Sequence, residues 1–431
     1  MKRKKTLNIA IVGLGNIGTF LFKYLNKNKK SLTKKTNVQP NILYVSAKNI
    51  NKKRGIIINK KLWLKNYMDA AYKKEVDIVI ELIGGADGAA KNLVFKALEN
   101  KKHVITANKA LIAKYGDKLS KIAENNKVNL EYEAAVCGGV PIIRLLKEGL
   151  IANNIKKVKG IFNGTSNFIL TTMEKNKISF KEALISAQKL GFAESNPESD
   201  INGEDVASKL KILSSLCFNS FLNNNIYVEG IKNVDHDDII NADKLGYKIK
   251  LLGFSEVNQN KITQRVHPTL IKKNSYIASV NGVLNAIIMD GKPVGTSIIQ
   301  GEGAGPEATT SALVSDISSI LRGNIKYPFS ISSKERKKIK FDSILNQKFS
   351  SYIRLDVLDK HGVLSNITSV LAKNKVSIKR LIQTPFKTKK HSCVIIITHK
   401  AIDFDLMKTL AVLSNKNYTI SRPKLIRIDN N

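Results

Sequence analysis

The stretch LNIAIVGLGNIG, residues 7–18, determines how the N-terminal third of the chain is expected to fold. Leu7–Val12 is a short apolar run of β-forming residues, and a G-x-G-x-x-G motif follows it directly. A helical stretch to about Asn28 comes next. In this strand-to-helix context the glycines let the backbone approach a pyrophosphate at the positive end of a helix, whereas a merely glycine-rich turn is the weaker interpretation. The candidate dinucleotide-binding residues are Gly13, Leu14, Gly15, Asn16, Ile17 and Gly18.

Strand and helix patterns alternate through the rest of this region. Further strands are predicted at Ile42–Ser46, Val76–Leu82, His103–Thr106 and Leu130–Ala134, and helices at Ala89–Asn100 and Ala110–Asn125. Such alternation is typical of a doubly wound parallel sheet, so the fold class is α/β of Rossmann type.

Basic residues stand where an NAD-specific site would carry an acid. No Asp or Glu occurs between Thr19 and Met68, and the end of the second strand is followed by Lys48 and then by Lys52, Lys53 and Arg54. Cations there suit the 2′-phosphate of NADP better than the ribose hydroxyls of NAD. In so lysine-rich a chain, chance could also place Lys48 at this position.

An unusually polar segment, GFAESNPESDINGEDVASK at residues 191–209, opens into a helix predicted over Asp205–Phe218. Asp205 and Lys209 are four residues apart and share a helix face that borders the core. Lys209 is therefore expected to be half buried, while Ser208, Lys211 and Ser215 are expected to face water. A polar substrate site and a simple intrahelical ion pair explain this spacing equally well.

Composition limits the classes of function. A net charge of +36 would normally suggest nucleic-acid binding, but the lysines are spread along the chain without aromatic interleaving, so no nucleic-acid partner is expected. No apolar run is long enough to cross a membrane. Three widely spaced cysteines argue for a reducing, cytoplasmic setting.

The last part of the chain predicts a separate unit. Residues 330–350 are polar and charged and are interpreted as a linker. Beyond them, strands and helices follow in the order β-α-β-β-α-β, which is a ferredoxin-like unit. The predicted strands are Tyr352–Leu358, Ser377–Gln383, Ser392–Thr398 and Tyr418–Ile428, and the predicted helices are Leu364–Asn374 and Phe404–Ser414.

With these motifs the chain resembles the homoserine dehydrogenase family over nearly its whole length. The family's acidic signature matches at Gly191, Pro197, Asp200, Gly203, Asp205 and Lys209. Its Thr-Ala-Asn-Lys-Ala and Asn-Gly-Thr-Thr-Asn stretches resemble residues 106–110 and 163–167. The tail resembles an ACT domain at residues 359–364. No aspartate kinase region precedes the nucleotide-binding region, so a monofunctional enzyme is expected.

The resemblance implies NAD(P)H-dependent reduction of L-aspartate 4-semialdehyde to L-homoserine, a step of threonine, methionine and isoleucine biosynthesis. It makes Lys209 the proton donor and Asp205 its orienting partner and a substrate ligand. Glu194 would bind the substrate ammonium, and Lys109 would contact cofactor and substrate. It also adds Thr106, Gly191 and Gly303 to the cofactor-binding residues.

A monovalent metal ion, usually sodium, is also implied by the resemblance. A glutamate side chain and backbone carbonyls would hold it, here Glu133, Val136, Gly138 and Val140. The alternative is a glycine-rich crossover between domains. Three residues depart from the family pattern: Asn196 replaces an acid, Cys137 a smaller residue, and His361 a frequent proline in the ACT turn.

These inferences divide the chain into four parts. Residues 1–141, completed by 307–327, form the nucleotide-binding domain; residues 142–306 form an α+β catalytic and dimerisation domain; 330–350 is the linker; 352–428 is the ACT domain, with threonine as a possible effector. A homodimer or homotetramer is expected. The rival functions are another NADP-dependent reductase and an amino-acid-sensing protein with an inactive reductase domain, and the intact 187–209 signature argues against both.

Overall fold

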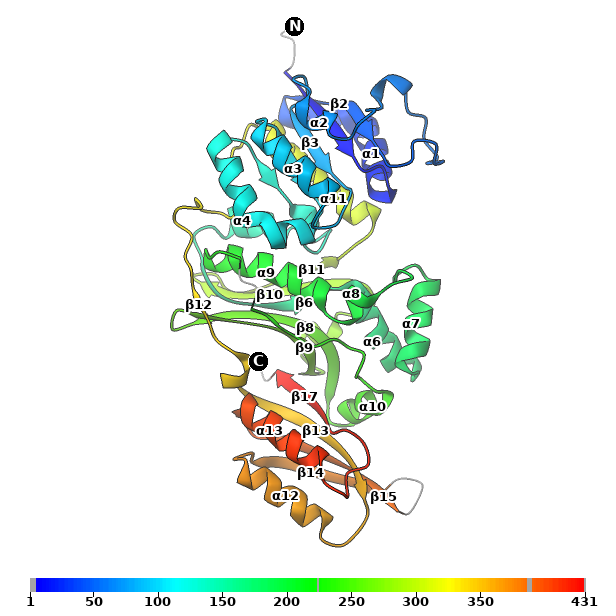
Figure 1. The fold of residues 1–431 in the computed structure, drawn as a ribbon, viewed down its shortest axis with the longest axis vertical. Helices are drawn as coiled ribbons and strands as arrows, with labels where there is room; N and C mark the ends of the chain where they lie inside the picture. The colour runs from blue at the N-terminus through cyan, green and yellow to red at the C-terminus, as the bar shows by residue number, and fades with distance from the viewer. Residues whose placement is uncertain (1–4, 223–224, 386–389, 430–431) are drawn as a thin grey trace.

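A computed structural model describes residues 5–222, 225–385 and 390–429, and shows three layered regions stacked along the long axis of the molecule (Figure 1). The N-terminal region lies at one end and a curved mixed sheet lies in the middle. A smaller α+β unit lies at the other end.

The N-terminal region is the predicted doubly wound sheet. Five parallel strands lie in the order β2-β1-β3-β4-β5, with Ile9 and Ile11 facing one layer of helices and Ala10 and Val12 the other. Because both faces are covered, the strands are nearly continuous apolar runs. The strands are β1 (Thr6–Val12), β2 (Gln39–Ser46), β3 (Ile78–Glu81), β4 (His103–Thr106) and β5 (Leu130–Glu131).

Helices from two distant parts of the chain cover this sheet. One face packs on α1 together with α11, which follows the last strand of the middle region, and the other face packs on α2, α3 and α4. Helix α1 extends eight residues beyond the predicted end at Asn28. The helices are α1 (Asn16–Thr36), α2 (Asp69–Tyr72), α3 (Ala89–Glu99), α4 (Lys109–Asn126) and α11 (Pro306–Leu321), with a 3₁₀ turn η1 at Lys60–Leu62.

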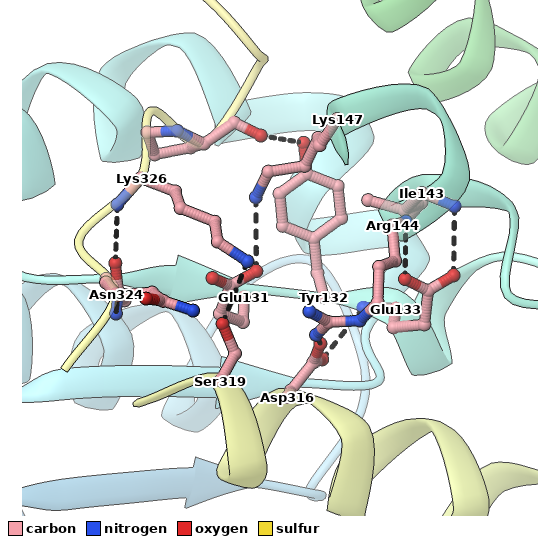
Figure 2. Close-up of polar contacts among 12 residues, drawn as sticks. Glu131, Tyr132, Glu133, Ile143, Arg144, Lys147, Asp316, Ser319, Asn324 and Lys326 are labelled. Atoms are coloured by element: carbon pink, nitrogen blue, oxygen red, sulfur yellow. Dashed lines mark hydrogen bonds and ion pairs between the residues drawn. The ribbon is translucent and has the colours of Figure 1, made fainter. Parts of the chain in front are cut away.

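The last strand of this sheet is shorter than predicted. The expected strand Leu130–Ala134 ends at Glu131, and Glu133–Ala135 forms a 3₁₀ turn, η2. The cause is the Glu133 carboxylate, which accepts hydrogen bonds from the backbone amides of Ile143 and Arg144 at 2.9 and 2.6 Å (Figure 2). The chain therefore turns out of the sheet and into the middle region.

The middle region is built on the mixed sheet. Its strands are β6 (Asn154–Ile161), β7 (Tyr227–Val228), β8 (Tyr247–Asn258), β9 (Lys261–Lys272), β10 (Leu284–Lys292) and β11 (Gly295–Glu302). Its helices are α5 (Ile142–Arg144), α6 (Gly164–Asn176), α7 (Phe180–Lys189), α8 (Glu198–Ile201), α9 (Glu204–Phe218) and α10 (His236–Lys244), with a π-helical turn η3 (Leu145–Gly149) and a 3₁₀ turn η4 (Tyr276–Ser279). Helix α9 lies between α4 and strands β6 and β8, and so connects two regions.

One face of α9 differs from the prediction. Ser215, expected to face water, is buried, and Lys211 is partly buried, so that burial lowers its pKa. The reason is the segment that follows α11, because the side chain of Arg336 covers this face and donates to the Ser215 hydroxyl at 2.7 Å.

The C-terminal unit has the predicted β-α-β-β-α-β order and a ferredoxin-like sheet order of β17-β13-β15-β14. The final strand, β17, starts later than predicted, at Lys424. It also pairs in parallel with β9, so the sheet of the C-terminal unit and the mixed sheet of the middle region form one continuous sheet. The elements are β13 (Lys348–Leu358), α12 (Val363–Lys373), β14 (Ile378–Pro385), β15 (His391–Thr398), β16 (Ala401–Ile402), α13 (Asp403–Ser414) and β17 (Lys424–Asp429).

Residues 330–350 are not the free linker that their polarity suggested. They contain β12 (Lys340–Phe341), which pairs with β9, and a 3₁₀ turn η5 (Ile344–Asn346). Arg336 is fully buried: it pairs with Asp117 at 2.7 Å, donates to the carbonyl of Ser220, and lies over the ring of Phe329. This segment is therefore a packed strap that joins α4 and α9.

Arg336→Met should lower the free energy of unfolding by about 3 kcal/mol, because it removes the cation paired with Asp117 and leaves the Ser220 carbonyl with the Ser215 hydroxyl as its side-chain donor. Chemical denaturation of the full chain measures the change. The matched control is the exposed neighbour in Lys338→Met, which should stay within about 0.5 kcal/mol of the parent. Equal stability of the two variants would show that the strap contributes little.

Candidate active site

One buried carboxylate organises the polar centre of the molecule. Asp205 lies in the first turn of α9, where Gly203 precedes the helix with a positive φ of 87°. A β-carbon at Gly203 would lie 3.2 Å from both Val228 and Val266, so a glycine is needed for this entry angle. The turn places Asp205, whose side chain is 3% exposed, against the junction with the nucleotide-binding region.

Asp205 binds two lysines from different regions. Its Oδ1 pairs with Nζ of Lys109, the first residue of α4, at 2.7 Å, and its Oδ2 pairs with Nζ of Lys209 at 2.8 Å. Lys209 also donates to the carbonyl oxygen of Phe162 at 2.7 Å. The sequence could not show that Lys109 would reach this carboxylate.

The charges in this cluster are set by their mutual attraction. Burial alone would raise the pKa of Asp205, but Lys209, Lys109 and a hydrogen bond from Asn163 outweigh it and hold the pKa well below its usual range. Burial alone would lower the pKa of Lys209, but the Asp205 carboxylate raises it. Asp205 is therefore an anion at neutral pH, and Lys209 stays protonated beside it.

Asn163 completes the cluster, although the sequence reasoning gave it no individual role. Its amide nitrogen donates to Asp205 at 2.8 Å and to Asp200 at 2.7 Å, and its oxygen caps α6 by accepting from Ser166 N. Burial and the charge of Asp205 raise the pKa of Asp200. The sequence feature that could have singled out Asn163 was its place in an Asn-Gly turn between a strand and a helix.

The glycine motif forms a cradle at the start of α1. Gly13 has a φ of 111°, and a β-carbon there would lie 2.4 Å from the Leu82 carbonyl; a β-carbon at Gly18 would lie 2.2 Å from the Gly13 carbonyl. These two glycines allow close backbone packing. A β-carbon at Gly15 would meet nothing within 4 Å, so this position faces open space where a ligand's phosphates can approach.

A buried glutamate that the sequence analysis missed shapes the opposite side of this cradle. Glu81 ends β3, and its carboxylate accepts from the backbone amides of Ile83 and Gly84 and from the Thr106 hydroxyl at 2.5 Å. Thr106 in turn accepts from the Asn108 amide, and Asn108 caps α4 just before Lys109. The sequence feature that could have identified Glu81 was an acid at the end of the apolar run IVIE.

The basic residues after β2 are divided in the structure. Lys48 is exposed, whereas the Arg54 guanidinium returns to the glycine motif and donates from Nε to the Leu14 carbonyl at 2.9 Å while lying over the Trp63 ring. Arg54 is thus held against the glycine motif, and Lys48 follows the end of β2 by two residues.

Two predicted site residues lie apart from the charged cluster. Glu194 and Gly191 are exposed in the loop between α7 and α8, with the Glu194 backbone carbonyl accepting from the Gln188 side chain. Neither contacts Asp205 or the two lysines. Phe192 from the same loop packs on Phe168, with ring centroids 4.8 Å apart, and its carbonyl accepts from Thr165.

The loop proposed for a metal lies at the crossover between the two regions. The backbones of Cys137 and Gly138 have positive φ, and a β-carbon at Gly138 would lie 2.9 Å from the Gly303 carbonyl. Burial raises the pKa of Glu133 to about 7, although the hydrogen bonds that its carboxylate accepts from two backbone amides lower the pKa (Figure 2). Within residues 5–222, 225–385 and 390–429, no hydrogen bond reaches the carbonyls of Val136 or Gly138. One carboxylate with neutral carbonyls suits a monovalent hard cation.

Comparisons with known proteins agree with this arrangement. Family models described as "Homoserine dehydrogenase, NAD binding domain" and "Homoserine dehydrogenase" match residues 13–133 and 141–318. A homoserine dehydrogenase of Helicobacter pylori is 38% identical over 99% of this chain and 100% of its own. The chain belongs to the homoserine dehydrogenase family.

Solved homoserine dehydrogenases have the same fold. A structure from Thiobacillus denitrificans superposes with a TM-score of 0.92 at 35% identity, covering 99% of this chain and 98% of that one. One from Staphylococcus aureus gives 0.78 at 32% identity, with full coverage of both. The protein is thus an NAD(P)-dependent oxidoreductase with homoserine dehydrogenase function. Within the described part of the chain, no helix has the length and apolar character needed to cross a membrane.

Proposed function

We propose that this homoserine dehydrogenase reduces L-aspartate 4-semialdehyde to L-homoserine with NADPH, and that Lys209 supplies the proton. The single observation that carries the proposal is the carboxylate of Asp205 held between Lys109 and Lys209. The cofactor supplies a hydride to the aldehyde carbon. The residues of the chain supply charge and a proton at the oxygen.

Lys209 is prepared for this role by its hydrogen bonds. An ammonium has three N–H groups. Lys209 donates one to the Phe162 carbonyl and one to Asp205, which leaves the third for the substrate oxygen. The charge of Asp205 keeps Lys209 protonated despite its burial. A developing alkoxide is a much stronger base than an amine, so proton transfer from this ammonium remains favourable.

Lys109 and Glu194 are proposed as substrate-binding residues. The Lys109 side chain is 40% exposed, so it can contact the substrate while its charge stays paired with Asp205. The exposed carboxylate of Glu194 is a natural partner for the substrate ammonium, which requires the loop between α7 and α8 to approach the cluster. Gly191, with its positive φ of 75°, lies in that loop.

NADP is proposed over NAD because cations, and no acid, follow β2. Lys48 and Arg54 are the candidate contacts to the 2′-phosphate, with Thr106 and Gly303 on the nicotinamide side of the cradle. A sodium ion is proposed at the Glu133 carboxylate and the carbonyls of Val136, Gly138 and Val140, although the Val140 carbonyl already accepts from Ile142 N at 2.7 Å.

The C-terminal unit is proposed to be an ACT domain that binds threonine or another amino acid. A cavity of about 630 Å³ lies at its first turn, lined by residues that include Asp359, His361 and Gln383. A homodimer or homotetramer is proposed because β11 is an edge strand with exposed Ile298. The three free cysteines support a cytoplasmic setting.

Lys209→Met should lower kcat for aspartate semialdehyde reduction by at least about a hundredfold, because general acid catalysis is lost. Loss of reduced-nicotinamide absorbance measures turnover, and cofactor fluorescence shows that NADPH still binds. The exposed lysine in Lys181→Met is the control and should keep parental kcat. Near-normal turnover of the Lys209 variant would disprove the proton-donor assignment.

Asp205→Asn should move the alkaline rise of homoserine oxidation to lower pH by about one unit or more. In this direction Lys209 must be neutral to accept a proton. Without the carboxylate that raises its pKa, burial lowers that pKa, so the neutral form appears at lower pH. The midpoint of the pH profile is the readout, and Glu198→Gln, an exposed acid, is the control. An unchanged midpoint would show that the titrating group is not Lys209.

Lys48→Glu should raise KM for NADPH by about tenfold or more and KM for NADH by less than about threefold, because only NADPH places a phosphate near the reversed charge. Steady-state kinetics with both cofactors measure the ratio. Lys34→Glu, an exposed lysine near the far end of α1, is the control. Equal changes for the two cofactors would contradict the 2′-phosphate assignment.

A further inference from the structure

A second polar cavity lies far from the candidate active site, on the face of the mixed sheet opposite α9. It has a volume of about 200 Å³ and is enclosed by β6, β8 and β9 on one side and by the start of β13, Lys400 and the end of β17 on the other. We call it the junction cavity, because its walls come from both the middle region and the C-terminal unit.

The innermost wall of the junction cavity is a buried arginine. Arg265 is 7% exposed, and its guanidinium is fixed between the rings of Phe254 and Phe349, at 4.5 and 5.2 Å from their centroids. Its NH1 pairs with Glu256 at 2.9 Å. Its Nε is buried and has no hydrogen-bond partner in the described part of the chain. An oriented donor without a partner is costly unless something fills the cavity beside it.

His267 provides a second unpartnered nitrogen in the same wall. Its ring is stacked on Phe254, and its Nδ1 lies 2.9 Å from the Pro268 carbonyl. Its Nε2 is buried without a partner among the described residues. Burial, Arg427 and Arg265 lower the pKa of His267 well below its usual value, so the ring is neutral. With Nδ1 donating to Pro268, Nε2 can accept the hydroxyl proton of a protonated oxyanion.

The rim of the junction cavity carries an excess of positive charge. Lys157, Lys348 and Lys400 line it, and none has an ion pair within the residues that the structure describes. The two acids that line the cavity are already paired, Glu256 with Arg265 and Asp429 with Lys159. Burial and the neighbouring Lys159 lower the pKa of Lys157, and the attraction of Asp429 and Glu256 offsets only part of this effect.

We propose that the junction cavity binds a small oxyanion of the phosphate type. Such an anion would accept from Arg265 Nε, offset part of the positive charge of Lys157, Lys348 and Lys400, and fit the cavity volume. A lysine-rich surface alone would not produce this arrangement, because Arg265 and His267 lie inside the protein and are held by aromatic rings. The bound anion would join the catalytic sheet to β13 and β17, and this proposal does not depend on the roles assigned to Lys209 or Asp205.

Calorimetric titration of the full chain with inorganic phosphate tests this proposal. Saturating NADPH is present, so that phosphate does not report on the nucleotide site, and chloride at matched ionic strength is the reference. We expect saturable binding of phosphate that the double variant Lys157→Gln, Lys400→Gln weakens at least tenfold. Lys34→Gln, on α1, should bind phosphate as the parent does.

Two results would overturn the proposal. One is equal phosphate affinity of the parent and of the double variant, provided that their melting temperatures without phosphate agree. The other is a titration in which phosphate gives no saturable heat of binding beyond that given by chloride at the same ionic strength. Because neither lysine is fully buried, the double variant should fold. The titration measures binding alone, so its outcome is separate from the turnover assays.

Discussion

The shared carboxylate of Asp205 is the interaction on which the site depends. It comes from the first turn of α9 in the middle region, and it holds Lys209 from the same helix and Lys109 from the start of α4. An anion this deeply buried is stable only with such partners. The pairing therefore fixes how the nucleotide-binding region faces α9, and the charge of Asp205 raises the pKa of the buried Lys209.

Supporting contacts converge on the same junction. The Glu81 carboxylate binds the turn after β3 and the Thr106 hydroxyl at the end of β4. Thr106 in turn binds Asn108, so these contacts set the position of Asn108 and Lys109. From the other side, Glu133 and Arg336 fix the two crossings between the regions, each through buried hydrogen bonds to backbone groups. Each of these residues orients backbone that carries a site residue, although none of the three lies in the acid–lysine cluster. Their role explains why charged residues are buried at this boundary at all.

The sequence predicted the elements with strong local signals and missed those set by distant contacts. The periodicity of apolar residues and the spacing of glycines were enough to predict the parallel sheet, helix α9 and the ferredoxin-like unit. The early end of β5, the buried Ser215 and the packed strap around Arg336 all depend on partners ten or more residues away, which no local pattern contains. In the site, the four-residue spacing of Asp205 and Lys209 was readable, whereas the salt bridge to Lys109 and the roles of Glu81 and Asn163 required the fold.

The parallel pairing of β17 with β9 has a consequence for how the chain is made. The segment Thr269–Ile271 pairs with Arg427–Asp429, so this part of the mixed sheet keeps an open edge until a much later stretch of chain has been synthesised. At typical rates of translation the interval is on the order of ten seconds. An unpaired apolar edge is a site of association with other chains during that time, so the nascent protein is expected to be most vulnerable to aggregation after its middle region is complete and before its last strand emerges.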